Sequence, residues 1–145
     1  MYKMLLMAVL AFASVAPAQA EDDRPIAYQQ LPQAAQNFVS QHFKGSTPSL
    51  TKEERGVFHR SYEVLFTNGN KIEFDRSGRW TDIDCRYSQV PASVVPVPIA
   101  QYVKQHFPNV RIVELQRERR GYSVDLSNKI ELDFDKRFRL TKWDN

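Results

Sequence analysis

Apolar residues recur with helical spacing in two separate segments of the chain. In residues 31–43 and 95–107 they return every three or four positions, which is the period of a helix with one buried face. Pro32 and Pro96 stand near the start of these segments, where a missing amide hydrogen costs nothing. Both segments end in Gln-His-Phe, and a glycine or proline follows shortly after. The pattern predicts two equivalent helices, 64 positions apart.

After each helix the spacing of apolar residues changes to two, which is typical of strands with one buried face. Residues 61–84 and 121–144 show this alternation and align with an offset of 60 positions. An Asn-Gly pair favours a tight hairpin within the first of these segments. A further strand is expected before each segment, at 50–56 and at 110–118. Each helix is therefore followed by four predicted antiparallel strands.

These two units predict an α+β fold built as a tandem repeat. One helix on four strands is marginally stable alone, but two units can share an eight-stranded sheet with both helices on one face. We expect repeat 1 over about 31–85 and repeat 2 over about 95–145, in a single domain that follows an N-terminal linker at 21–30. The difference between the two offsets predicts an insertion in the first unit, which we place at 45–49.

The first twenty residues have the pattern of a signal peptide. Lys3 precedes an apolar run at 4–16 that is too short to span a bilayer comfortably, and Ala-Gln-Ala at 18–20 is a cleavage motif. The alternative, a retained membrane anchor, is disfavoured by the short run and by the cleavage motif. We predict cleavage after Ala20, a periplasmic or secreted location, and no membrane insertion after cleavage.

The net charge of +3 is a small excess, and it excludes a uniformly basic surface. Nucleic-acid binding needs lysines and arginines clustered on one face, and the run Arg-Glu-Arg-Arg at 117–120 is interpreted as a solvated turn. We expect no nucleic-acid partner. Cys85 is the only cysteine, so the fold contains no disulfide, and we expect this thiol to be buried.

No combination of residues has the signature of an enzyme. Cys85 and the three histidines are the components of a nucleophile–base pair, but no catalytic motif surrounds them. His42 and His106 occupy equivalent helix positions and are interpreted as packing residues, because no further ligands converge on them. We predict a non-enzymatic protein without catalytic residues, metal or cofactor.

The order of these pieces resembles the secreted PepSY-like proteins, which are described as beta-lactamase-inhibitor-like. The resemblance covers about 31–145 and rests on the segments 31–43, 62–85 and 121–144. It implies a curved eight-stranded sheet with helices on its convex side, and export. It also implies an open sheet face that grips a partner protein, or inhibition of a peptidase. Phe138 stands where the first unit has Gly78, so the second turn departs from the pattern.

Strand alternation predicts which side chains lie on the open face of the sheet. If Tyr62, Val64, Ile72, Phe74 and Ile83 face the helices, their neighbours point outward. Those neighbours are rich in carboxylates. The predicted partner-binding residues are Trp80, Glu63, Leu65, Glu73, Asp82, Asp84, Asp125 and Asp133.

Three interpretations of this acidic face stay open. It is a solvated surface, a binding face for a basic protein or peptide with Trp80 as its anchor, or a divalent-cation site without calcium-loop spacing. Asp75 and Asp135 have a separate explanation, because each opens a turn in which aspartate bonds the backbone ahead. We predict recognition of a protein or peptide, with an inhibitor-like role implied by the resemblance. The alternative is a periplasmic scaffold for a small molecule or divalent cation.

Overall fold

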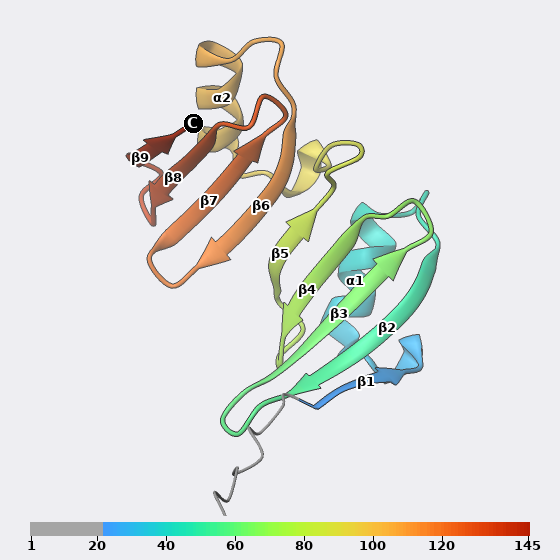
Figure 1. Cartoon of the computed structure of the whole chain (residues 1–145). Coiled ribbons are helices and arrows are strands. Elements are labelled where there is room, and N and C mark those ends of the chain that lie inside the picture. Colours follow the sequence, from blue (N-terminus) through green and yellow to red (C-terminus); the bar gives the residue numbers. More distant parts are fainter. Residues whose placement is uncertain (1–21) are drawn as a thin grey trace, which may run out of the picture.

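The computed structural model describes residues 22–145, which form one antiparallel sheet with two α-helices on one of its faces (Figure 1). The predicted signal peptide, 1–20, lies outside these residues. The nine strands are β1 (Asp22–Ile26), β2 (Pro48–Arg55), β3 (Arg60–Phe66), β4 (Lys71–Asp75), β5 (Trp80–Asp84), β6 (Ile112–Glu118), β7 (Gly121–Leu126), β8 (Glu131–Asp135) and β9 (Leu140–Asp144). Their order in the sheet is their order in the chain.

The two helices predicted from the spacing of apolar residues are present in the structure. Helix α1 (Gln33–His42) and helix α2 (Val97–His106) each contain ten residues. A proline caps the start of each helix, and the amide of a phenylalanine closes its end by donating to a valine carbonyl. Short 3-10 turns precede them at Tyr28–Gln30 and Ala92–Val94. Within 22–145, no helix is long and apolar enough to span a membrane.

The core lies between the helices and one face of the sheet. Its strand residues include the five residues predicted to face the helices, which are all buried: Tyr62, Val64, Ile72, Phe74 and Ile83. The two helices make corresponding aromatic contacts. Phe38 of α1 meets Phe74 edge-on at 5.9 Å between ring centroids, and Tyr102 of α2 meets Phe134 at 5.5 Å. The prediction of an inward apolar face is confirmed.

The expectation of eight strands was wrong, because β1 forms in the segment expected to be a linker. Residues 22–26 pair with β2 along their whole length. Their sequence, Asp-Asp-Arg-Pro-Ile, lacks apolar alternation because nearly all of this edge strand is exposed. Pro25 is tolerated there, since an edge strand leaves one row of backbone groups unpaired. Arg24 also ties the strand to its neighbour, with its Nη2 2.7 Å from Oε2 of Glu53.

The insertion in the first half lies in the β2–β3 hairpin and not at 45–49. Pro48 pairs with Phe66, and the corresponding pair in the second half is Ile112 with Leu126. Pro48 and Ile112 are 64 positions apart, as the two helices are, whereas Phe66 and Leu126 are 60 positions apart, as the later strands are. The extra residues lengthen the hairpin tip, which comprises 55–60 in the first half and only 119–120 in the second.

The β4–β5 and β8–β9 turns share one backbone shape despite their different sequences. Gly78 has φ 85° and Phe138 has φ 61°, so both occupy the left-handed region. At Gly78 a Cβ atom would lie 2.9 Å from the backbone nitrogen of Ala35 and 2.9 Å from Cβ of Pro32. Phe138 instead stacks its ring on Tyr122, 5.4 Å between centroids, which offsets the strain of its conformation. The start of α1 therefore packs directly on the β4–β5 turn.

Replacing Gly78 by alanine is expected to lower the free energy of unfolding by about 2 kcal/mol or more, through backbone strain and the clash with α1. Gly45→Ala is the matched control, because the Cβ atom that it adds has no other atom within 4 Å, and the change should cost less than about 0.5 kcal/mol. Urea denaturation measures both. Equal effects of the two changes would show that α1 does not pack closely on this turn.

Candidate functional site

Residues on the open face align in two rows that cross the sheet from strand to strand. In each row, every residue lies directly opposite the next one. The first row is Lys52, Glu63, Glu73, Asp82, Gln116, Ser123, Asp133 and Lys142. The second row is Leu50, Leu65, Lys71, Asp84, Glu114, Asp125, Glu131 and Asp144. We call the acidic members of these rows the carboxylate ladder.

The carboxylate ladder places like charges side by side. Glu63, Glu73 and Asp82 are successive in the first row, and the second row continues without interruption from Asp84 to Asp144. Directly opposed like charges destabilise a pair of strands. A sheet face that only keeps the protein soluble can have acids and bases interspersed, which avoids this repulsion. The uninterrupted acids of the ladder therefore lower the stability of the fold.

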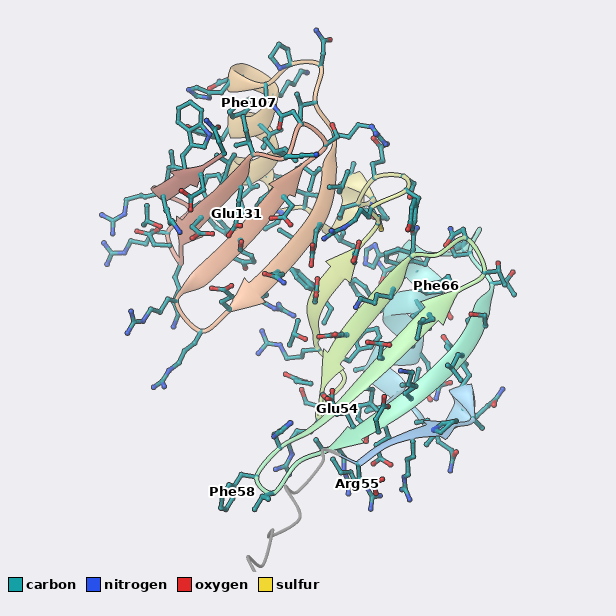
Figure 2. The ribbon with its side chains drawn as sticks, viewed as in Figure 1. Glu54, Arg55, Phe58, Phe66, Phe107 and Glu131 are labelled. Carbon is teal, nitrogen blue, oxygen red and sulfur yellow. The ribbon has the colours of Figure 1, made fainter. Side chains whose placement is uncertain are left out.

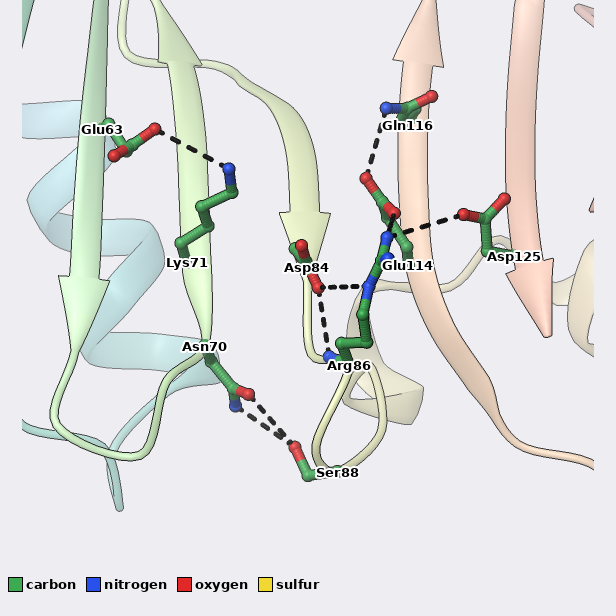
Figure 3. A network of polar contacts seen from close by, with 9 residues as sticks. All are labelled: Glu63, Asn70, Lys71, Asp84, Arg86, Ser88, Glu114, Gln116 and Asp125. Carbon is green, nitrogen blue, oxygen red and sulfur yellow. Dashed lines mark hydrogen bonds and ion pairs between the residues drawn. The ribbon is translucent and has the colours of Figure 1, made fainter. Parts of the chain in front are cut away.

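Arg86 partly compensates this charge where the two halves of the sheet meet (Figure 3). Its Nη2 lies 2.8 Å from Oε2 of Glu114 and 4.0 Å from Oδ2 of Asp125, and its Nε lies 3.7 Å from Oδ1 of Asp84. Lys71 lies farther along the same row, with its Nζ 4.0 Å from Oε2 of Glu63. One guanidinium therefore faces three carboxylates.

Burial and mutual repulsion raise the pKa values of three acids in the ladder. Burial raises the pKa of Asp82 to about 7, with a further contribution from the charge of Glu114. Burial and a hydrogen bond with Glu114 raise the pKa of Asp125 to about 6. The pKa of Glu73 is also raised, first by burial and then by Glu63 despite the opposing charge of Lys71. The residues in 22–145 therefore compensate the negative charge of these groups only in part, and each takes up a proton more readily than a solvated carboxylate.

Two carboxylate oxygens in the first row have no hydrogen-bond partner among residues 22–145. Oδ1 of Asp82 and Oδ1 of Asp133 are shielded from solvent, and neither accepts a hydrogen bond from the residues that the structure describes. An unpaired buried acceptor costs free energy until a donor or a cation reaches it. The open face is thus suited chemically to a positively charged ligand.

The structure brings seven of the eight predicted site residues together in the two rows. These are Glu63, Leu65, Glu73, Asp82, Asp84, Asp125 and Asp133. The predicted site set lacked Glu114, Glu131 and Arg86. Alternation with buried Leu115 points to Glu114 as an outward residue, but only the pairing of β5 with β6 places it beside Asp84. Arg86 follows the last residue of β5 by two positions, and no signal in the sequence indicates its partners.

The prediction that Trp80 lies among the outward carboxylates was wrong. A bulge at Thr81 makes Trp80 lie opposite Phe74, which belongs to the core. The Trp80 ring packs against the core, and the guanidinium carbon of Arg117 lies 4.3 Å from the ring centroid. Nε and Nη2 of Arg117 donate to the carbonyl oxygen of Trp80 at 3.1 and 2.6 Å. The side chain therefore stabilises the helix-facing side of the sheet and cannot anchor a partner on the open face.

Asp75 and Asp135 belong to turns, as predicted. Oδ1 of Asp75 accepts hydrogen bonds from the amides of Ser77 and Arg79 at 2.9 and 3.0 Å. Oδ1 of Asp135 accepts the corresponding bonds from Arg137 and Arg139 at 2.9 and 3.0 Å. Although burial opposes the change at Asp75, these bonds lower the pKa of both acids. They hold the hairpins and do not belong to the ladder.

The thiol and the helix histidines make no catalytic arrangement. Cys85 is fully buried, as predicted, and burial raises its pKa to about 12, so it is not a nucleophile near neutral pH. His42 lies on the Phe38 ring and 2.9 Å from the hydroxyl of Ser93, while His106 stacks on Tyr102. Among residues 22–145, no group of three or more side chains is arranged to hold a metal ion.

Comparison with known proteins places this fold in a family. Residues 60–142, from β3 into β9, match the family described as "Putative beta-lactamase-inhibitor-like, PepSY-like". The chain belongs to the PepSY-like family. The resemblance seen in the sequence is therefore confirmed, and the match covers most of the carboxylate ladder. The comparison with curated proteins gives no match.

Three solved structures resemble this PepSY-like chain over most of its length. A "putative calcium-regulated periplasmic protein" from Bacteroides thetaiotaomicron is 44% identical with a TM-score of 0.84, over 85% of this chain and 97% of its own. A periplasmic protein of the DUF2874 family from Bacteroides vulgatus is also 44% identical with a TM-score of 0.84, over 87% and 99%. Another periplasmic protein of Bacteroides vulgatus, of unknown function, is 31% identical with a TM-score of 0.81, over 86% and 100%. These descriptions confirm the predicted periplasmic location, and none names an enzymatic activity.

Replacing Trp80 by alanine is expected to lower the free energy of unfolding by about 2–3 kcal/mol, because core packing and the contact with Arg117 are lost. Leu65→Ala, on the open face, should cost at most about 1 kcal/mol. Chemical denaturation of both variants measures the difference. If the Trp80 variant were as stable as the parent, the Trp80 ring would not be part of the core packing, and its placement on the open face would be favoured instead.

Replacing Asp82 by asparagine is expected to stabilise the protein in a pH-dependent manner. Because the folded-state pKa of Asp82 is raised to about 7, its favourable contribution is complete only below the unfolded value and is lost as pH rises through about 7. The variant should therefore be more stable than the parent at pH 8, by about 1–2 kcal/mol after allowance for solvent screening. The advantage should vanish as the pH falls to about 4.

Urea denaturation of the Asp82 variant at both pH values tests this expectation. Asp22→Asn, on exposed edge strand β1, is the control and should change stability little at either pH. A variant less stable than the parent at pH 8 would show that Asp82 is compensated in the folded protein.

Proposed function

We propose that this PepSY-like chain is an exported, non-enzymatic binding protein that recognises a cationic segment of a protein or peptide on the open face of its sheet. The carboxylate ladder carries the proposal. Its opposed acids, raised pKa values and unpaired oxygens on Asp82 and Asp133 are unfavourable in the free protein. A cationic partner would neutralise the acids and donate hydrogen bonds to the unpaired oxygens. Because this removes a destabilising contribution of the free protein, it would favour binding.

The shape of the ladder favours an extended partner over a single ion. Its acids run from β3 to β9, which at about 4.8 Å per strand corresponds to a track of about 30 Å. Lysine or arginine side chains spaced along a peptide match such a track, and electrostatic attraction accelerates their encounter with it. Leu50 and Leu65 end the second row and offer apolar contact beside the acids.

Other features of the protein are consistent with recognition by a rigid surface. We infer that the two halves are repeats of one unit, which places the ladder across two similar half-sheets with corresponding register. The buried Cys85 and the separated histidines support a non-enzymatic role. An inhibitor-like role would be one form of such recognition, and the description of the family favours it.

A divalent-cation scaffold is the second candidate. The unpaired oxygens of Asp82 and Asp133 are suitable calcium ligands, and the Bacteroides thetaiotaomicron neighbour is described as calcium-regulated. Against it, within 22–145 no group of three or more side chains is arranged to hold a metal ion, and the three carboxylates that meet at one point already share Arg86. The two candidates predict different ligands for the same face.

Titration calorimetry with an arginine- and lysine-rich peptide, and separately with calcium chloride, distinguishes these functions. We expect the peptide to bind at low salt, and the double change Glu73→Gln and Asp82→Asn to weaken binding about tenfold or more. The control changes Asp22→Asn and Glu118→Gln alter the charge equally but lie outside the two rows, and they should leave the affinity nearly unchanged.

The calcium titration gives the opposing result if the second candidate is correct. Saturable calcium binding that is lost in the Glu73 and Asp82 double variant, with no peptide binding, would establish the cation scaffold. Neither ligand binding to the parent protein would leave the ladder as a solvated surface and overturn both functions.

A further inference from the structure

The hairpins of this sheet alternate between its two ends, and four of them open at the same end. Because consecutive strands are antiparallel neighbours, the β2–β3, β4–β5, β6–β7 and β8–β9 turns all lie at the same end of the strands, toward the lower left in Figure 1. We call their residues, 55–60, 75–79, 117–121 and 135–139, the hairpin rim. The rim lies at the strand ends and is separate from the carboxylate ladder.

The hairpin rim carries half of the 20 lysines and arginines of the chain. Its cations are Arg55, Arg60, Arg76, Arg79, Arg117, Arg119, Arg120, Lys136, Arg137 and Arg139. Its carboxylates are Asp75, Glu118 and Asp135. The sequence scatters these cations over 85 positions, so only the strand order gathers them. The run at 117–120, interpreted above as a solvated turn, is one part of this larger basic edge.

Most of this positive charge is not neutralised by the residues that the structure describes, 22–145. Asp75 accepts hydrogen bonds from the backbone amides of its own turn, and Asp135 does the same and also pairs with Nε of Arg139 at 2.7 Å. Arg55 and Arg60 share Glu53, at 3.1 and 3.2 Å, with Arg24. Seven rim cations form no ion pair with any residue in 22–145, namely Arg76, Arg79, Arg117, Arg119, Arg120, Lys136 and Arg137.

The β2–β3 hairpin adds an exposed apolar tip to the rim. Phe58 is 98% exposed and Val57 is 70% exposed, and both belong to the inserted tip that the second half lacks. Figure 2 shows Phe58 at the far end of this hairpin, beyond Arg55 and pointing away from the sheet. Large apolar side chains this exposed indicate a contact surface when they lie together.

The chemistry of the rim matches phosphate. Nine of its ten cations are arginines, whose planar guanidinium groups bind phosphate oxygens in pairs. Two of the turns line a shallow, open hollow of about 420 Å³, with Arg119, Arg120, Asp135, Lys136, Arg137 and Arg139 around it. Phosphates presented over a broad surface would contact several hairpins at once, since the cations extend along the whole edge.

We propose that the hairpin rim binds the phosphate headgroups of an anionic phospholipid surface, with Phe58 and Val57 entering the boundary between headgroups and acyl chains. A basic patch combined with an exposed aromatic tip is the pattern by which peripheral proteins hold such surfaces. The alternative occupant is the carboxylate ladder of a second copy. The two rows that contain this ladder have apolar residues only at Leu50 and Leu65, and they offer no phosphate for the arginines. The contact is peripheral and leaves the open face of the sheet free for its own ligand.

Co-sedimentation of residues 22–145, which contain every element of the described fold, tests this proposal. The vesicles are phosphatidylcholine alone, or phosphatidylcholine with about 30% phosphatidylglycerol. We expect binding only to the anionic vesicles and a decrease with salt. The triple change Arg76→Gln, Arg119→Gln and Arg120→Gln should weaken binding on the order of 100-fold, since each cation near such a surface contributes about fivefold. Phe58→Ser should weaken it about tenfold.

The matched control is Lys44→Gln, Lys104→Gln and Lys129→Gln, which removes the same charge from exposed positions outside the rim. It should bind the anionic vesicles nearly as the parent does. No binding by the parent, or an equal loss in rim and control variants, would overturn the proposal. So would salt-sensitive self-association without vesicle binding, seen by sedimentation velocity and lost in the rim variant, because this result would assign the rim to a second copy.

Discussion

The pairing of β5 with β6 makes one sheet out of two halves, and it consists of only three residue pairs. Ile83 and Leu115 are buried on the helix side of this joint, so the core is continuous across it. On the other side the same pairs bring Asp82 and Asp84 against residues of β6. The joint therefore stabilises the fold on one face and concentrates negative charge on the other. Arg86 lies at this point because three carboxylates meet there.

Antiparallel strands in chain order also separate the two signs of charge. Alternation along each strand places acids on the open face, whereas the turns at one end gather arginines. The net charge of +3 conceals this separation, since each region nearly cancels the other. The protein thus presents an acidic sheet face and a basic edge. The first suits a cationic ligand and the second suits an anionic surface.

Local patterns predicted much of this arrangement, and non-local pairing explains the errors. The period of Val64, Ile72 and Phe74 identified the buried face and most acids of the ladder. The prediction put Trp80 on the wrong face because a bulge at Thr81 turns its side chain toward the core. No residue type in β5 predicts this bulge. Strand β1 was missed because an exposed edge strand needs no apolar alternation. The partners of Glu114 and the gathering of the rim arginines depend on strand order, which a single segment does not contain.

The central claim is that the negative charge of the ladder acids is only partly compensated until a cationic ligand binds, which keeps their pKa values raised. Carboxyl carbon shifts of Asp82 and Asp125, followed by NMR as a function of pH, measure this directly. The account predicts midpoints near 7 and near 6 in the free protein, both of which fall when an arginine-rich peptide is added. Midpoints near 4, as in unfolded chains, that the peptide leaves unchanged would contradict it.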